Sequence, residues 1–384
     1  MVFSPAFILT LVVNVLFWSG AQVLFPVLPL YIASLGGTPT DNGLATLATA
    51  GTAVVARLFI GALADRLGRK PVILLGGICG AVVPLLYGAS HALLPLVAAR
   101  ALAGIGIAAF TTGFQALLAD LVPPEKRGEA FGWGGNSAAL ASLLGPITGA
   151  WIISRWGFLP AFDLAAFSGA LCALAALSIR EPPGGARQTT GALPLQGMRE
   201  ALALHSVRMS VIATCPLGLA FGTIFTFWPL VAQQNHLNTV GVFYSVYALG
   251  MLAVQTLAGR LSDRIGRTRV LLPGMLLAGV ALAMIPAARS DGASLLVAFA
   301  CGAGLGIART AIDALALDGV PGALRGTAVA IEFTNIDLWV GLGSALMGSL
   351  AGLAGYSAAY AVAGITCIAT AGVLVAVRRQ TPAT

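Results

Sequence analysis

Four charged residues interrupt long apolar stretches in the second half of the chain: Arg309, Asp313, Glu332 and Asp337. Three of them carry carboxyl groups, which could take up and release a proton. A charged side chain at membrane depth is costly, so such a residue is a candidate for function. Arg309 and Asp313 are four residues apart, which places them on one face of a helix, where they can pair. Asp337 lies deepest in its apolar stretch, and burial favours the protonated form of a carboxyl group. We therefore predict that Asp337 exchanges a proton. The further candidates for proton coupling are Asp313, Glu332, Asp163 and the neighbouring cation Arg309.

Uncharged polar residues and two further arginines recur within apolar stretches of the same kind. Each of them alone could be a hydrogen bond between helices. Together with the apolar and aromatic residues around them, they suit a small amphiphilic organic compound better than a simple ion. The residues predicted to line a substrate cavity are Asn14, Gln22, Arg57, Arg100, Gln115, Asn136, Thr226, Tyr244, Tyr247, Gln255 and Asn335.

The elements that must position these residues are apolar helices. Charged residues make up 9% of the chain and apolar residues 58%, whereas about 25% of the residues of a soluble domain are charged. Apolar stretches of about 20 residues, long enough to cross a bilayer, recur from end to end. The predicted spans lie near residues 6–34, 42–64, 71–89, 92–120, 128–152, 158–179, 207–233, 239–261, 269–287, 292–318, 325–353 and 355–377. The chain is therefore expected to be an all-α polytopic membrane protein with twelve transmembrane helices.

A polar interval divides the chain into a first bundle at residues 1–180 and a second at residues 207–384. The interval itself, residues 181–206, is predicted to be a cytoplasmic linker with a short surface helix over 195–205. Most basic residues fall in loops on one side of the predicted spans, which by the positive-inside rule makes both termini cytoplasmic. The net charge of +7 reflects this distribution, so the expected partner is the lipid bilayer and not nucleic acid.

Several kinds of site are not expected. The five cysteines lie in apolar segments without a C-x-x-C spacing, and the three histidines are scattered, so neither a disulfide nor a metal site is predicted. No Walker motif and no convergent catalytic constellation is present in the sequence, so we expect no cofactor and no enzymatic activity.

An internal repeat relates the two halves. Residues 61–69 read GALADRLGR and residues 259–267 read GRLSDRIGR, at an offset of 198 residues. The same offset relates Asp120 and Arg127 to Asp318 and Arg325, and we expect each aspartate to pair with the arginine of its own half. Two bundles with the same in/out sense are parallel repeats, which are typical of secondary transporters.

The chain resembles the major facilitator superfamily along essentially its whole length. The resemblance is carried by residues 61–70 (GALADRLGRK) between the second and third helices, together with the second copy of this motif. Residues 100–106 (RALAGIG) are similar to a second motif of the family, and residues 145–149 (GPITG) to the motif of its antiporter and drug-efflux branches.

This resemblance, closest to the bacterial proton-coupled drug and metabolite efflux branch, implies two pseudo-symmetric six-helix bundles around a central cavity. It also implies secondary active transport by alternating access, as a monomer in the plasma membrane (the bacterial inner membrane). The function expected from it is proton-coupled export of a small amphiphilic organic compound. Two alternatives stay open: a facilitator or importer of a sugar or other metabolite, and, more remotely, a non-transporting receptor or enzyme on the same scaffold.

The repeated motif is predicted to form a cytoplasmic latch of charge pairs. Gly68 permits a tight turn between helices, and Asp65 can face a helix N-terminus and nearby arginines. The alternative is that these basic residues only follow the positive-inside rule and that their pairing with aspartates is incidental. The residues assigned to the latch are Gly61, Asp65, Arg66, Gly68, Arg69, Asp120, Arg127, Asp263, Arg264, Arg267, Asp318 and Arg325.

A helix kink is predicted at Gly145, Pro146 and Gly149, because proline removes a backbone hydrogen bond and small residues permit a close approach of helices. The kink could be purely structural or could take part in coupling.

Overall fold

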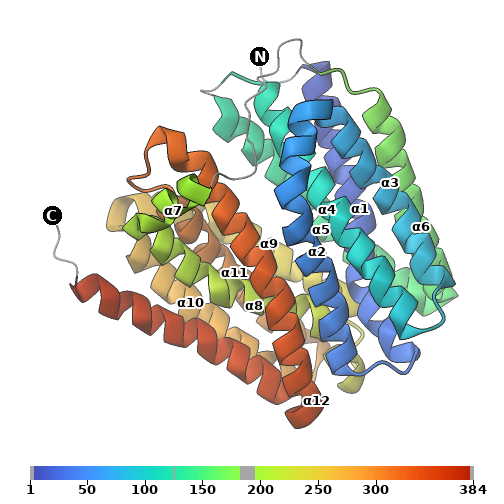
Figure 1. The fold of residues 1–384 in the computed structure, drawn as a ribbon. Helices are drawn as coiled ribbons and strands as arrows, with labels where there is room; N and C mark the ends of the chain where they lie inside the picture. The colour runs from blue at the N-terminus through green and yellow to red at the C-terminus, as the bar shows by residue number, and fades with distance from the viewer. Residues whose placement is uncertain (1–3, 124–125, 182–194, 381–384) are drawn as a thin grey trace. The chain divides into compact units, whose positions relative to one another are not determined.

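The computed structural model describes residues 4–123, 126–181 and 195–380, and within these residues the structure is helical, with no β-strand (Figure 1). The helices of the first half are α1 (Pro5–Ser34), α2 (Pro39–Leu67), α3 (Arg69–Ala89), α4 (Leu93–Asp120), α5 (Arg127–Trp156) and α6 (Phe158–Leu177). The helices of the second half are α7 (Leu195–Ala203), α8 (His205–Gln234), α9 (Val240–Ile265), α10 (Arg267–Met284), η2 (Ile285–Ala287), α11 (Asp291–Leu315), η3 (Gly322–Leu324) and α12 (Arg325–Gln380). The predicted all-α fold class is confirmed.

The number of membrane-spanning helices agrees with the prediction. Over the described residues, eleven helices are long and apolar enough to cross a membrane. One of them, α12, contains two of the predicted spans, because Gly355 has a φ of 83° and interrupts the helix. Gly157, at the same position of the repeat, has a φ of 82° and ends α5. The short helix predicted over 195–205 is α7.

Local sequence signals explain where several helices begin. Ser4 caps α1 by accepting a hydrogen bond from the Phe7 N–H at 3.2 Å, and Ser290 caps α11 in the same way from the Ala293 N–H at 3.3 Å. Such a side chain satisfies one of the backbone donors that a helix start leaves open.

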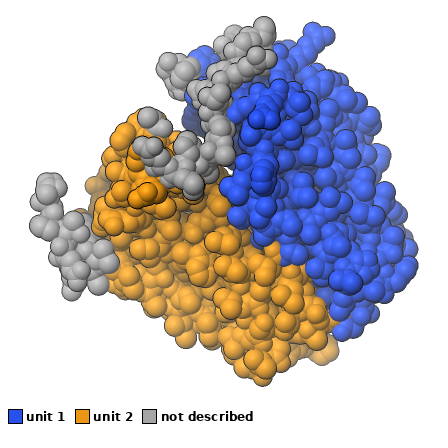
Figure 2. All heavy atoms as spheres, in the orientation of Figure 1, with its two compact units in different colours: residues 1–36, 48–192 blue, residues 37–47, 193–384 orange. Residues whose placement is uncertain are grey.

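The chain divides into two compact units, coloured separately in Figure 2. The first unit comprises residues 1–36 and 48–192, and the second comprises residues 37–47 and 193–384. The first turns of α2 therefore group with the second unit, which the repeat did not anticipate.

Each unit has its own set of helix contacts, and the two sets correspond. In the first unit α1 packs on α5 and α6, and α3 packs on α4 and α6. In the second unit α8 packs on α12, and α10 packs on α11 and α12. Because the same helices of the repeat are neighbours within each unit, the prediction of a duplicated bundle is confirmed.

Small residues allow these helices to approach closely, as expected where lipid supplies little hydrophobic drive between helices. A Cβ atom at Gly104 of α4 would collide with the Thr49 carbonyl oxygen of α2, and one at Gly302 of α11 would collide with the Tyr247 carbonyl oxygen of α9. These two contacts occupy equivalent positions of the repeat, so the register of the repeat holds at the level of single residues.

The predicted close approach at residues 145–149 is also present. A Cβ atom at Gly145 of α5 would lie 2.6 Å from Cβ of Gln22 in α1, and one at Gly149 would collide with the Val23 carbonyl oxygen. Pro146 lies inside α5 between these glycines. The two glycines therefore let α5 pack directly against the backbone of α1, whereas the kink itself stays a prediction.

Candidate functional site

Arg69 joins α2, α3 and α4 of the first unit. Its Nη1 donates to Asp65 Oδ1 at 2.8 Å, and its Nε donates to Asp120 Oδ2 at 3.1 Å. Gly68, directly before it, has the positive φ (98°) that was predicted for this turn and that glycine adopts without steric cost. The exposed fraction is 12% for the Arg69 side chain and 14% for each aspartate. We call these three charged residues the first motif cluster.

Arg267 repeats the arrangement in the second unit. It donates from Nε to Asp318 Oδ2 at 3.1 Å and from Nη1 to Asp263 Oδ1. Gly266, before it, has a φ of 97°. The exposed fractions are higher, at 24% for Arg267, 68% for Asp263 and 46% for Asp318. We call these three charged residues the second motif cluster.

The pairing within the clusters corrects one expectation. Asp120 was expected to pair with Arg127, and Asp318 with Arg325, but both aspartates pair with the motif arginines instead. Arg325 donates from Nε to the Val320 carbonyl oxygen at 3.3 Å. The physical reason is distance. Arg69 begins α3 and lies between Asp65 of α2 and Asp120 of α4. Arg267 begins α10 and lies between Asp263 of α9 and Asp318, which follows α11.

The remaining latch residues differ in exposure. Arg66 and Arg264 are exposed, and Arg127 is half-buried. Gly61 has room for a side chain, since an added Cβ would meet no atom within 4 Å. Close packing therefore does not require a glycine at position 61.

Glu181, which the sequence did not single out, contacts the start of α3 beside the first motif cluster. Its Oε1 accepts a hydrogen bond from the Lys70 N–H at 2.6 Å, and Lys70 Nζ donates to the Leu177 carbonyl oxygen. A Cβ atom at Gly68 would lie 2.7 Å from the same Oε1. A carboxylate at the start of α3 complements the positive end of the helix dipole. Its signal in the sequence is slight, because Glu181 is a single acidic residue at the start of the polar linker.

A second group of charges lies between α11 and α12 of the second unit. Arg309 Nε pairs with Asp313 Oδ1 at 2.7 Å, as predicted, and Arg309 Nη2 lies 3.6 Å from Glu332 Oε1. The same guanidinium therefore contacts both carboxyl groups. Glu332 is 3% exposed. We call Arg309, Asp313 and Glu332 the carboxyl cluster; Asp337 is half-buried on α12.

Two of the predicted cavity residues bond α1 to α5. Asn14 Nδ2 donates to the Gly134 carbonyl oxygen at 3.0 Å and to Ser137 Oγ at 2.7 Å. Gln22 Nε2 donates to Ser142 Oγ at 2.6 Å. Both amides therefore hold the two helices together in this structure.

Two cavity residues of the second unit have similar bonds. Asn335 Nδ2 donates to the Val211 carbonyl oxygen at 3.0 Å. Thr226 Oγ1 lies 3.1 Å from Thr46 Oγ1 and 3.1 Å from Ser344 Oγ. These hydroxyl groups join α8 to α12 and to the first turns of α2.

The two predicted tyrosines belong to an aromatic layer between α8 and α9. Tyr244 stacks on Phe225 with ring centroids 5.6 Å apart, and Tyr247 meets Phe221 edge-on. The Tyr247 hydroxyl group is buried and has no hydrogen-bond partner among the described residues. The other predicted residues vary: Arg57 and Arg100 are half-buried, whereas Gln115, Asn136, Gln255 and Asp163 are exposed.

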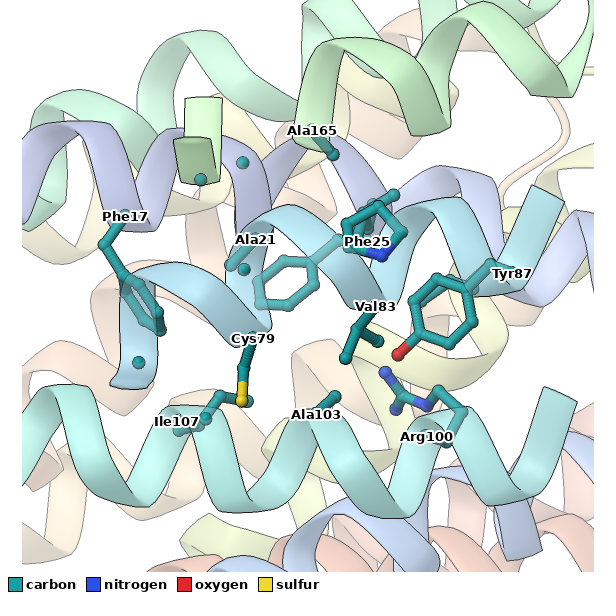
Figure 3. Close-up of a pocket in the computed structure, with 18 residues that line it drawn as sticks. Phe17, Ala21, Phe25, Cys79, Val83, Tyr87, Arg100, Ala103, Ile107 and Ala165 are labelled. Carbon is teal, nitrogen blue, oxygen red and sulfur yellow. The ribbon is translucent and has the colours of Figure 1, made fainter. Parts of the chain in front are cut away.

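The pocket in Figure 3 lies wholly inside the first unit, between α1, α3, α4 and α6. Its volume is about 100 Å³. Most of its lining is apolar, and Arg100 of α4 projects toward the Tyr87 hydroxyl group of α3 at one end. Of the predicted cavity residues, Arg100 is the one that lines this pocket.

Taken together, a duplicated helical bundle, charged turns at equivalent positions and buried charges within apolar helices define a multi-pass membrane transporter. The family model described as Major Facilitator Superfamily matches residues 10–238 and 210–384. The chain belongs to this superfamily.

Similar proteins agree with this assignment. The chain is 30% identical over 288 residues to the multidrug resistance protein MdtG of Enterobacter lignolyticus (strain SCF1), covering 70% of this chain and 67% of that relative. It is 27% identical over 376 residues to MdtG of Salmonella arizonae, covering 93% of this chain and 90% of that relative.

Two solved structures share the fold. The nucleoside transporter NupG superposes with a TM-score of 0.80 at 13% identity, over 98% of this chain and 100% of that chain. A bacterial homologue of the human lysosomal transporter Spinster superposes with a TM-score of 0.76 at 19% identity, over 97% of this chain and 96% of that chain.

Proposed function

We propose that the protein exports small amphiphilic organic compounds in exchange for protons, by alternating access, as a monomer in the bacterial inner membrane with both termini cytoplasmic. The direction of transport is supported by similarity to relatives named multidrug resistance proteins. The orientation is supported by the concentration of basic residues in the loops on one side.

Proton coupling is carried by the carboxyl cluster. Arg309 pairs with Asp313 at 2.7 Å and lies 3.6 Å from Glu332, which is almost completely buried. One guanidinium therefore faces two carboxyl groups, and a proton on one of them would balance the charge of the cluster.

Arg309 gives this site two states. A guanidinium stabilises a carboxylate beside it, whereas a buried carboxyl group without such a partner is favoured in its neutral form. A movement that lengthens the 3.6 Å separation between Arg309 and Glu332 would favour uptake of a proton by the cluster. A movement that shortens it would favour release of the proton. Asp337 follows Glu332 by five residues on α12, so it stays a candidate for proton transfer beside the cluster.

The motif clusters are proposed to stabilise one conformation through the start of α3 and of α10. The first cluster connects α2, α3 and α4, and the second connects α9, α10 and the turn after α11, so a change in helix position within a unit would break its ion pairs. The turn containing Gly68 and the turn containing Gly266 would then act as the latch predicted from the repeat.

Reconstituted transport tests the proposal. Proteoliposomes are given a pH gradient, and the movement of ethidium, rhodamine 6G and fluorescein is followed together with the lumenal pH. The wild-type protein should accumulate at least one dye against its gradient while protons move in the opposite direction. Glu332→Gln and Asp313→Asn should abolish accumulation driven by the pH gradient but keep exchange of labelled for unlabelled dye.

The matched control is Glu129→Gln, which neutralises an exposed carboxylate of α5 and should leave coupling unchanged. Asp337→Asn tests whether the deepest carboxylate takes part. Accumulation that survives neutralisation of Asp313, Glu332, Asp337 and Asp163 together would refute proton coupling at these groups. Dye movement that follows its own gradient without proton movement would favour a facilitator.

A further inference from the structure

The pocket of the first unit has a charged end and an apolar end. At the charged end the Arg100 guanidinium faces the Tyr87 hydroxyl group (Figure 3). At the apolar end lies Phe17, whose ring stacks on Phe110 with centroids 3.7 Å apart and an interplanar angle of 4°. Between the two ends, Val83 and other apolar side chains form the walls. The space is therefore shaped for a molecule with one polar and one apolar end.

Small residues keep this space open. Glycines and alanines of all four helices line it, among them Gly80 and Ala103. A Cβ atom at Gly80 would have its nearest neighbour at 3.5 Å, so a methyl group fits there in ordinary contact. The volume of about 100 Å³ is about two thirds of that of an engineered cavity of roughly 150 Å³ that binds benzene. The apolar end of a ligand would thus be no larger than one small ring.

The repeat shows that the charged end is not required by the fold. At the offset of 198 residues, Ala298 stands where the first unit has Arg100, and Ile285 stands where it has Tyr87. Both residues are fully buried in the second unit. The second bundle therefore packs an apolar layer where the first holds a cation and a hydroxyl group. A cation within an apolar helix, at a position where the other unit has none, is a functional candidate.

We propose that this pocket binds an amphiphilic organic acid, with its carboxylate on Arg100 and its apolar body, about one aromatic ring, between α1, α3 and α4. The guanidinium fork matches a carboxylate with two parallel hydrogen bonds. The Tyr87 hydroxyl group holds the fork in place and can donate to the same carboxylate. Of the eighteen residues that line the pocket, Arg100 is the one that carries a charge, so a cationic ligand would be repelled and a neutral one would gain less.

This site goes beyond the proposed export function. It lies inside one unit, and its occupation requires neither a proton gradient nor transport. Binding can therefore be measured on the whole purified protein in detergent or in nanodiscs, separately from transport in proteoliposomes.

Three probes of nearly equal shape separate charge from size: 3-phenylpropionate, 3-phenylpropionamide and 3-phenylpropylammonium. Equilibrium dialysis with radiolabelled compounds gives the dissociation constant of each. The acid should bind roughly tenfold or more tightly than its amide, the factor expected for a charge-assisted over a neutral hydrogen bond. The ammonium compound should not bind measurably. This comparison needs no variant.

Variants then assign the binding to the pocket. Arg100→Gln should remove the preference for the acid over the amide, and Arg100→Lys should restore part of it by returning the charge without the fork. Ala103→Leu fills the pocket and should abolish binding of both compounds. The controls are Arg155→Gln, which removes an exposed charge of the same unit, and Leu102→Phe, which enlarges an exposed side chain of α4. Neither control should change binding.

The proposal is overturned if the acid and the amide bind equally to the wild-type protein. It is overturned equally if the preference survives Arg100→Gln, or if the acid still binds to Ala103→Leu. Thermal unfolding of each variant shows whether it is folded. If Arg100→Gln is not folded, the comparison of the acid with the amide on the wild-type protein decides the question. Binding of the acid without proton-driven transport of the dyes would support this site and refute only the export function. Proton-driven transport without binding of the acid would refute only this site.

Discussion

The two motif clusters have the same residue types, and in both the arginine donates from Nε and Nη1 to its two aspartates, but they differ in their exposure to solvent. In the first, Arg69 and its two aspartates are 12–14% exposed. In the second, Arg267 is 24% exposed, and its aspartates are 68% and 46% exposed. The arrangement of the ion pairs is therefore alike in the two units, whereas their exposure to solvent differs. The loss of stability on removing an ion pair should consequently differ between the units.

The loss of stability depends on whether the charge that remains after its partner is removed is exposed or buried. An exposed ion pair contributes only about 0–1 kcal/mol, because water solvates the partner that remains. Removing one partner of a buried pair costs about 3–5 kcal/mol, because an uncompensated charge stays buried. The first motif cluster lies nearer to the buried case. We therefore expect the first cluster to matter for stability and conformation, and the second to be largely tolerant of change.

The largest expected difference is between Arg69→Met and Arg267→Met. The first substitution removes the cation that joins Asp65 and Asp120 in a largely buried cluster, which should cost about 3–5 kcal/mol. The second should cost about 0–1 kcal/mol, because both aspartates of that cluster are well solvated. Thermal unfolding of the purified variants measures the difference, and a similar fall in Tm for both would contradict the comparison.

Labelling of the buried free cysteines would show which unit of Arg69→Met unfolds first on heating. Cys79 and Cys172 lie in the first unit, and Cys301 and Cys367 lie in the second. With a thiol-reactive label and peptide mass spectrometry, Arg69→Met should expose the first two at a lower temperature than in the wild-type protein. The other two should be unaffected until the whole chain unfolds.

A smaller difference is expected in transport, between Asp65→Asn and Asp263→Asn. Asparagine keeps the size of the side chain but loses the charge-assisted hydrogen bond to the arginine. At about 1.5–3 kcal/mol for such a bond, Asp65→Asn should lower export roughly tenfold or more, at normal membrane levels of the protein. Asp263→Asn should retain most activity because its pair is exposed. Full activity of Asp65→Asn would count against the latch.

Much of the fold was predictable because helix length, apolar composition and repeat offset are properties of the sequence itself. The offset of 198 residues correctly paired Asp65 with Asp263 and Asp120 with Asp318 on corresponding helices. The positive φ at Gly68 followed from the need for a tight turn. These features depend on local conformation or on a symmetry that the residues display directly.

The environment of each charge was less predictable. The exposures of Asp65 and Asp263 differ although their motifs match, because burial depends on segments distant in the sequence. Glu181, 111 residues after Lys70, contacts the start of α3 and could not be placed from a motif. Similarly, the prediction that Asp337 exchanges a proton used its depth alone, and the approach of Arg309 to Glu332 depends on how α11 packs against α12.

The smallest expected difference concerns the glycines of the two turns, and it isolates the contribution of Glu181. Alanine at either Gly68 or Gly266 must adopt a positive φ, which costs about 1–2 kcal/mol. At Gly266 an added Cβ meets no atom within 4 Å, whereas at Gly68 it lies 2.7 Å from Glu181 Oε1. Gly68→Ala should therefore displace the Glu181 carboxylate and lose about 0.3–1 kcal/mol more, the usual contribution of an anion at a helix N-terminus.

A double-mutant cycle measures this excess. In a Glu181→Ala background, Gly68→Ala and Gly266→Ala should lower the free energy of unfolding equally, because the contact that distinguished them is gone. Added salt should also reduce the difference in the native background, since Glu181 is exposed and its interaction is screened. A difference that persists without Glu181 and at high salt would mean that the turns themselves differ in strain, and the two units would then be unequal in backbone conformation as well as in environment.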